Sequence, residues 1–134
     1  HDWKNLKLEG TVNPLEKIQG DCFDIEAVIE PGKASEVRFD VRGTVVVWSA
    51  AKQELSGLGR TGPLPLRNGR IELRLLVDRT SVEIFGNRGE MVMSSCFLPP
   101  VENRSFGLSA QEGAGAPARV VSMTVRELNS AWEP

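Results

Sequence analysis

The stretch LRLLVDRTSVEIFGNRGE, residues 73–90, decides the fold of this chain. Aliphatic residues occupy every second position over 73–77 and again over 82–84, and the polar Asp78-Arg79-Thr80 separates the two runs. Alternation with a period of two on both sides of a short polar break predicts a β-hairpin with one buried face. Asn87-Arg88-Gly89 predicts a second tight turn, because Asn and Gly adopt positive φ at little steric cost.

Size and composition indicate one globular domain. The chain has 134 residues, with 40% hydrophobic and 25% charged residues, which are ordinary values for such a domain. The formal net charge is −2, and no basic stripe marks a nucleic-acid partner. No apolar run approaches the roughly 20 residues of a membrane-spanning helix. We therefore predict a single domain over residues 1–134, with neither nucleic acid nor membrane as its partner.

Strand signals continue along the rest of the chain. Residues 22–30 and 37–41 alternate cleanly, and each run ends at a turn dipeptide. A short strand at 52–55 precedes residues 56–65, whose Gly and Pro content predicts mostly loop. Further strands are predicted at 44–48, 71–77, 91–97, 105–110 and 120–128. Regularly spaced hairpins without a helix are typical of two antiparallel sheets packed face to face. The predicted fold class is an all-β sandwich, a lectin-like jelly roll.

The cysteines and the acidic residues give no metal pattern. Cys22 and Cys96 have no spacing that argues for a disulfide; we interpret them as two thiols in or near the sheets, with a disulfide as the alternative. The single histidine is His1, and no loop has the density of Asp and Asn oxygens that calcium requires. The sequence therefore predicts neither a metal nor a cofactor.

Several segments resemble the C-terminal β-sandwich domain of glycoside hydrolase family 32, the invertase, levanase and inulinase family. The most specific is LLVDRTSVEIF at 75–85, which is similar to the family's vDrsSvEvF run, and residues 87–90 lie where its ndGe turn follows. Residues 21–27 look like the family's first core strand, and 52–55 like the segment after its central strands. Residues 125–132 are similar to its last strand and the Trp that follows.

This resemblance implies that the chain is a fragment of a longer fructan- or sucrose-cleaving enzyme, which is secreted or periplasmic. The opening His1-Asp2-Trp3, without an initiator Met, also favours a fragment. The family's catalytic motifs (Asn-Asp-Pro-Asn, Arg-Asp-Pro and Glu-Cys) belong to its N-terminal five-bladed propeller and do not occur here. Retaining glycosidases need two carboxyls about 5–5.5 Å apart, and the sequence singles out no such pair. We expect no enzymatic activity from the chain alone.

Four polar residues are candidate carbohydrate-binding residues: Asp78, Arg79, Glu83 and Asn87. Glu83 lies outside the hydrophobic phase of its strand. Its carboxylate could accept hydrogen bonds from sugar hydroxyls. The alternatives are that it anchors a neighbouring loop or a partner domain, or that it is simply solvated. Asp78 and Arg79 are suited to clamp a fructosyl unit or, alternatively, to form the hairpin turn. Asn87 has the same two readings, sugar ligand or turn residue.

Aromatic residues give little support for an extended sugar-binding strip. The aromatic residues in apolar phase, which we predict to be core, are Phe23, Phe39, Trp48 and Phe97. Trp3 and Trp132 lie near the termini and are expected to meet each other or the propeller. A small pocket for one terminal sugar residue remains compatible with this distribution.

Two hypotheses from different classes follow. In the first, the domain is structural: it docks against the catalytic propeller and stabilises it. In the second, it is an autonomous module that binds the terminal fructose of levan or a related fructan. The expected partners are therefore the propeller of the parent chain and a fructan or fructose.

Overall fold

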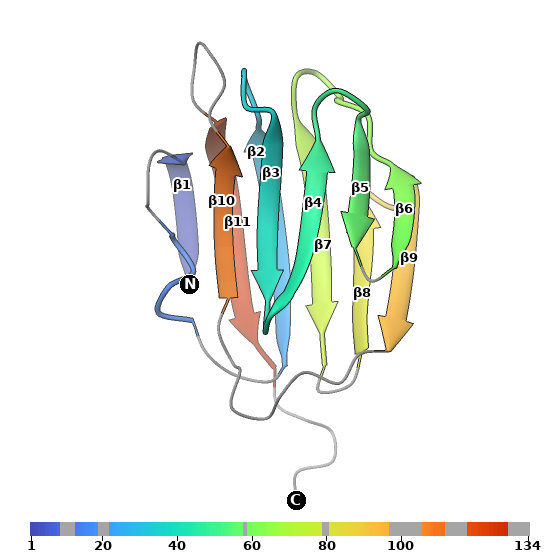
Figure 1. Ribbon diagram of the computed structural model, residues 1–134. Coiled ribbons are helices and arrows are strands. Elements are labelled where there is room, and N and C mark those ends of the chain that lie inside the picture. The colour runs from blue at the N-terminus through green and yellow to red at the C-terminus, as the bar shows by residue number, and fades with distance from the viewer. Residues whose placement is uncertain are drawn as a thin grey trace, which may run out of the picture.

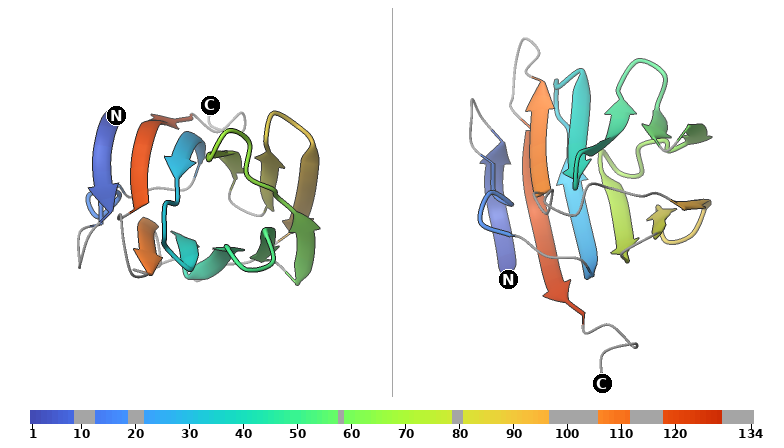
Figure 2. Two further views of the ribbon diagram at one scale, coloured as in Figure 1. Left: turned by 90° about the horizontal axis from the view of Figure 1, so that it is seen from above. Right: turned by 60° about the horizontal axis from the view of Figure 1, so that its bottom comes forward.

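The computed structural model describes residues 1–8, 13–18, 22–57, 59–78, 81–96, 106–111 and 118–128, with only the backbone of residues 95 and 96. These residues form two antiparallel sheets that pack face to face (Figures 1 and 2). The six-stranded sheet has the order β1 (Asp2–Leu8), β11 (Ala118–Glu127), β2 (Phe23–Glu30), β7 (Ile71–Val77), β8 (Ser81–Gly86) and β9 (Met91–Cys96). The five-stranded sheet has the order β10 (Phe106–Gln111), β3 (Glu36–Val41), β4 (Thr44–Ser49), β5 (Glu54–Gly57) and β6 (Arg60–Pro63). The all-β sandwich predicted from the sequence is confirmed.

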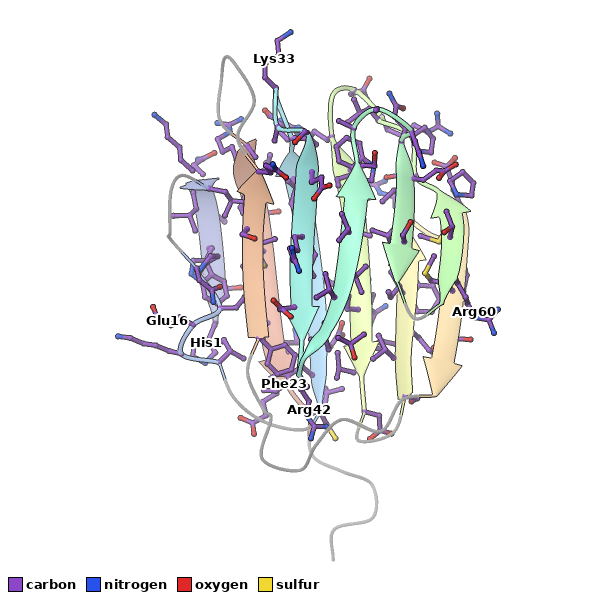
Figure 3. The ribbon with its side chains drawn as sticks, viewed as in Figure 1. His1, Glu16, Phe23, Lys33, Arg42 and Arg60 are labelled. Carbon is purple, nitrogen blue, oxygen red and sulfur yellow. The ribbon has the colours of Figure 1, made fainter. Side chains whose placement is uncertain are left out.

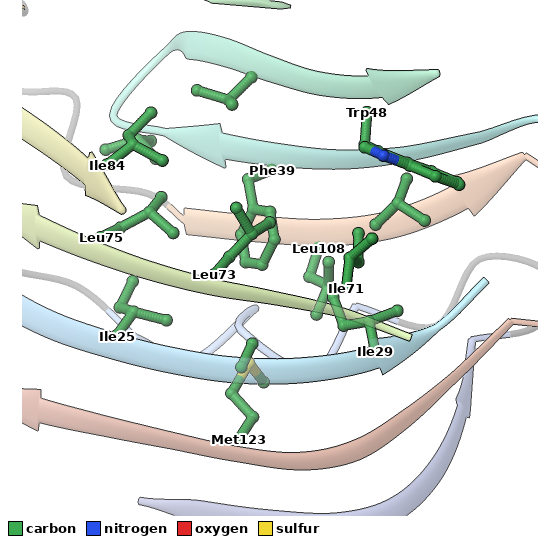
Figure 4. Close-up of a cluster of buried hydrophobic side chains, with 14 of the residues drawn as sticks. Ile25, Ile29, Phe39, Trp48, Ile71, Leu73, Leu75, Ile84, Leu108 and Met123 are labelled. Carbon is green, nitrogen blue, oxygen red and sulfur yellow. The ribbon is translucent and has the colours of Figure 1, made fainter. Parts of the chain in front are cut away.

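The core lies between the sheets and is built from the inward phase of each strand. Ile25, Leu75 and Ile84 of the six-stranded sheet are fully buried opposite Phe39 and Trp48 of the other sheet (Figure 4). The indole N–H of Trp48 donates a hydrogen bond to the carbonyl of Leu64 at 2.8 Å, so this large side chain is buried without an unsatisfied donor. The predicted core positions Phe23, Phe39 and Trp48 are confirmed, whereas Phe97 lies outside the described residues.

One end of the sandwich is filled by aromatic packing. The rings of Phe23 and Phe106 meet edge to face, with their centroids 4.9 Å apart. Figure 3 shows Phe23 and Arg42 at this end, whereas Lys33 lies at the opposite end. Arg42 and Gly43 both have positive φ and form the predicted two-residue turn between β3 and β4.

At one side of the sandwich, the edge strands β6 and β9 of the two sheets lie close together. A Cβ placed on Gly62 of β6 would come within 3.0 Å of the Met91 side chain of β9. The absence of a side chain at position 62 therefore lets the two edges approach, and it explains why a Gly occurs in a strand here.

A β-bulge in β11 corrects the phase of its sequence. Ala118 and Val120 are buried, but the next buried residues of this strand are Met123 and Val125, so the alternation slips by one position. The pairing with β2 shifts register between Val120 and Ser122, which leaves Val121 as the extra residue. Because of the bulge, Ala118 and Val120 face the core and so do Met123 and Val125, although Val120 and Met123 lie three positions apart.

Two parts of the strand prediction are wrong. Residues 56–65 are not mostly loop, because β5 and β6 form a hairpin from Glu54 to Pro63. Gly62 and Pro63 are tolerated because they lie in β6, which is an edge strand. The strand β1 was not predicted, since only Trp3, Leu6 and Leu8 of it are partly or fully buried. Within the described ranges, no helix is long and apolar enough to cross a membrane.

Candidate functional site

Of the predicted carbohydrate-binding residues that the structure describes, Glu83 lies on β8 (Ser81–Gly86), Asp78 follows β7 and Asn87 follows β8. The register of the β7–β8 hairpin pairs Val77 with Val82, and the hairpin is closed by a hydrogen bond from the Asp78 amide to the Ser81 carbonyl at 2.9 Å. Asn87 follows the far end of β8, six positions beyond Ser81, which is about 20 Å at the usual strand rise. Asp78 and Asn87 therefore lie near opposite ends of β8 and do not share one pocket.

Asn87 is a buried turn residue with 5% of its surface exposed. Its side-chain oxygen accepts a hydrogen bond from the Glu72 amide at 3.1 Å, and its side-chain nitrogen donates to the Pro65 carbonyl at 2.7 Å. Its backbone φ is 48°, in the left-handed region that Asn tolerates. The side-chain amide of Asn87 is thus hydrogen-bonded to the backbone of the same chain, which favours a structural role in the turn over a role in sugar binding.

Asp78 is also involved in contacts within the domain. The Cys22 thiol donates a hydrogen bond to Asp78 Oδ1 at 3.3 Å, which links the start of β2 to the end of β7. Cys22 is present as a buried thiol, as predicted, and the side chain of Cys96 lies outside the described residues. Arg79 also lies outside the described residues.

Glu83 lies exposed on the outer face of the six-stranded sheet, as its phase predicts. The cross-strand neighbours of Glu83 are Leu76 on β7 and Ser94 on β9. Among the described residues, no ion pair or hydrogen bond of its carboxylate is present. Its position is compatible with a ligand or a partner domain.

The same outer face carries a network of four charged side chains centred on Asp24. Arg74 donates two hydrogen bonds to Asp24, from Nε at 3.0 Å and from Nη2 at 2.9 Å. Arg126 lies 3.8 Å from Asp24 and 3.5 Å from Glu26, and Arg74 lies 3.5 Å from Glu26. The bidentate bond to Asp24 raises the pKa of Arg74, and this geometry holds the guanidinium plane in place.

Next to this network the outer face is hollowed. A cavity of about 580 Å³ lies over β11, β2, β7 and β8, and we call it the outer groove. Its lining includes Glu26, Val28, Glu72, Arg74, Leu76, Phe85 and Arg88. Phe85 points outward from β8, half-buried, between Arg74 on β7 and Val92 on β9.

Ion pairs fix the end of the outer groove near the turn at 87–90. Arg88 Nε donates to Glu72 Oε2 at 2.9 Å, while 85% of the Arg88 side chain remains exposed. Arg67 forms a bidentate pair with Glu90, at 3.1 and 2.6 Å, which ties the neighbouring hairpin to this turn. The hydrogen bonds from Arg67 lower the pKa of the Glu90 carboxyl.

Hydrogen bonds from arginine side chains lower the pKa of two carboxyl groups. Glu30 and Glu90 have shifted pKa values, and both shifts are downward, caused first by hydrogen bonds from Arg119 and Arg67. A general acid needs the opposite shift. Among the residues that the structure describes, no group of three or more His, Cys, Asp or Glu side chains could hold a metal ion.

Sequence reasoning missed the outer groove. The outward phase of Phe85 was visible in the alternation of residues 81–85 and could have marked an exposed aromatic residue. The pairing of Arg74 with Asp24 had no local signal, because the two residues lie 50 positions apart and meet only through the β2–β7 register.

Comparison with known proteins identifies the family. Residues 1–127 match the family model described as the C-terminal region of glycosyl hydrolases family 32. This chain belongs to the glycosyl hydrolase family 32 C-terminal domains. It is similar to a levanase of Bacillus subtilis, at 33% identity over 97% of this chain and 22% of the levanase. A levanase of Bacillus sp. strain L7 is also 33% identical, over 90% of this chain and 15% of that protein. This family 32 C-terminal domain thus spans about a fifth or less of the relatives that it matches.

Solved structures agree with the fold. The domain superposes on part of an exo-inulinase from Aspergillus awamori with a TM-score of 0.75 and 24% identity, covering 98% of this chain and 29% of that one. It superposes on a galectin from Caenorhabditis elegans with a TM-score of 0.66 and 13% identity, covering 94% and 96% of the two chains. At these identities the likeness concerns the fold alone.

Proposed function

We propose that this chain is the non-catalytic C-terminal sandwich of an exported fructan- or sucrose-hydrolysing enzyme, where it stabilises the catalytic propeller. The observation that carries the proposal is the extent of the family match, which covers residues 1–127 of this chain but only 22% and 15% of the two levanases. A unit of this size that accompanies a much longer hydrolase chain is expected to act through the domain beside it.

The described surface supports this role. Val92 on the edge strand β9 is 59% exposed, and Leu128 just after β11 is 42% exposed. Packing of a neighbouring domain on either side chain would be favourable, because it would remove apolar surface from water.

Removing residues 1–134 from the parent enzyme tests the proposal. We expect the truncated enzyme to unfold at a lower temperature, because a domain that binds only the folded propeller stabilises it. Adding the separate chain should restore part of the lost stability, and the chain alone should release no fructose from levan, inulin or sucrose. Unchanged thermal stability and activity after truncation would contradict the proposal.

A second candidate function is supported by the outer groove. In this function the domain is an autonomous module that binds the fructan on which the parent enzyme acts. A hollow of about 580 Å³ that combines an outward aromatic ring with fixed polar groups has the composition of a ligand site. Titration of the 134-residue chain with levan, inulin and fructose tests this candidate, and the absence of saturable binding to a folded sample would exclude it.

A further inference from the structure

The outer groove has the size and floor of a ligand site. Its volume of about 580 Å³ falls within the range of roughly 300–1,000 Å³ that small-molecule sites occupy. Its apolar lining includes the half-buried side chains of Val28, Leu76 and Phe85, which come from three adjacent strands. The aromatic ring of Phe85 supplies a flat apolar surface against which the C–H groups of a sugar ring can pack.

The charges around the outer groove cancel. Among the described residues, its lining contains two acids, Glu26 and Glu72, and two bases, Arg74 and Arg88, so their formal charges sum to zero. Such a site offers no net attraction to an anion or a cation. Its hydrogen-bonding groups nevertheless suit a neutral ligand with many hydroxyls, since carboxylates accept and guanidinium groups donate.

The polar groups of the outer groove are held in place before any ligand binds. Asp24 fixes the guanidinium of Arg74 through two hydrogen bonds, and Glu72 fixes Arg88 through one at 2.9 Å. The bond between Arg88 and Glu72 joins Nε to Oε2, and among the described residues the Arg88 terminal nitrogens and the second carboxylate oxygen of Glu72 remain for a ligand. Groups that are already oriented lose less entropy when they bind.

We propose that the outer groove binds a fructan chain, with a fructose ring on Phe85 and its hydroxyls hydrogen-bonded to Arg88 and Glu72. This proposal rests on the second candidate function and assigns it a site other than Asp78, Arg79, Glu83 and Asn87. A docking site for a protein domain fits less well, because Glu is depleted at protein interfaces and both Glu26 and Glu72 line the outer groove.

Titration of the 134-residue chain and its variants, followed by NMR chemical shifts and calorimetry, tests the proposal. The probes are levan oligosaccharides, inulin oligosaccharides and maltooligosaccharides. We expect saturable binding of a fructan, weakened by Phe85→Ala about tenfold, the factor that corresponds to 1.4 kcal/mol. Arg88→Asn, which retains a residue that tolerates the φ of 61°, should also weaken binding several-fold.

Control variants locate the site. Val47→Ala and Arg38→Gln lie on the outer face of the five-stranded sheet and should leave the affinity unchanged. Glu83→Gln lies on the same face as the outer groove but outside its lining, and it should also leave the affinity unchanged. Loss of binding in Glu83→Gln, with binding retained in Arg88→Asn, would overturn the assignment of the site.

Three further outcomes would overturn the proposal. The first is the absence of binding by any saccharide to the folded chain, and the second is equally tight binding of maltooligosaccharides. The third is a Phe85→Ala variant that destabilises the parent enzyme much more than the separate chain, which would indicate that the propeller covers the groove. None of these outcomes depends on whether truncation of the parent lowers its stability, so the stabilising role is judged separately.

Discussion

The two outer faces of the sandwich have similar sequence patterns and different structures. On both sheets, charged residues and a few apolar residues share the outward phase of the strands. On the six-stranded sheet, Asp24, Glu26, Arg74 and Arg126 form one ion-pair network beside a hollow. On the five-stranded sheet, no ion pair is present among the described residues of β3, β4, β5 and β6.

The difference teaches that outward polarity alone does not make a site. The register of the six-stranded sheet places Glu26 opposite Arg74 and Arg126 opposite Asp24, so opposite charges face each other across three strands. The register of the five-stranded sheet places Asp40 opposite Val45 and Arg38 opposite Val47. Only the first arrangement fixes polar groups in space, which a binding surface requires.

The largest expected difference between the faces concerns Asp24. Replacing it by Ala removes the bidentate partner of Arg74, and we expect the free energy of unfolding to fall by about 1.5 kcal/mol, a value reduced because Arg74 is half exposed. Asp40→Ala on the other face should cost less than about 0.5 kcal/mol. Urea unfolding of both variants checks this, and equal losses would break the comparison.

The second-largest expected difference in stability between the faces concerns Phe85. Its half-buried ring on the outer face predicts a loss of about 1.5 kcal/mol for Phe85→Ala, whereas Val47→Ala on the other face should lose less than about 1 kcal/mol because it removes fewer apolar atoms. Thermal unfolding of the separate chain measures both. A loss of more than twice the expected value for Phe85→Ala would show that the ring is a core residue and not a platform.

The stability of the two outer faces should also depend differently on pH, and Glu30 at the end of β2 tests this for the six-stranded sheet. The hydrogen bond from Arg119, together with Arg70, lowers the pKa of this carboxyl below its ordinary value of 4.5 in the folded state. The pair therefore stabilises the fold above about pH 4.5, and this contribution is lost as the pH falls through the lower folded pKa. The difference in unfolding free energy between the wild type and Glu30→Gln should shrink from about pH 7 to about pH 3.

The matched control for this pH series is Glu36→Gln on the other outer face. Glu36 begins β3 and has no ion-pair partner among the described residues. The difference in unfolding free energy between the wild type and Glu36→Gln should therefore change less over the same pH range. A pH-independent difference for Glu30→Gln would contradict the role of Arg119.

The smallest expected effect is that of Glu83→Gln on the stability of the separate chain. Glu83 is exposed and has no ion pair among the described residues, so the change should remain within about 0.5 kcal/mol. Circular dichroism during thermal unfolding measures it. A larger loss would reveal an interaction that the outer face does not show.

The fold could be predicted because its signals are local. Alternation in residues 22–30 and 73–85 specifies both the strands and their buried faces, and turn residues such as Asn68 and Gly69 mark where the chain reverses. The β5–β6 hairpin was missed because Gly62 and Pro63 are typical of loops, while here an edge position and the closeness of Met91 accommodate them.

The candidate site was predicted only in part. Glu83 was correctly placed on an exposed face, since strand phase is enough to orient one residue. The outer groove could not be predicted, because Asp24 and Arg74 become neighbours only when β2 pairs with β7. Which of two polar faces becomes organised depends on such long-range pairing, and a single sequence does not encode it in any short window.

The burial of Trp48 makes the domain its own optical reporter. Its indole lies at 1% exposure and donates to the Leu64 carbonyl, between the two sheets. With Trp3 and Trp132 replaced by Phe, the remaining emission should come from this one ring and shift to longer wavelength when the sheets separate and water reaches it. Each stability measurement on the separate chain can then follow the parting of the two sheets directly, in dilute samples and without an added dye.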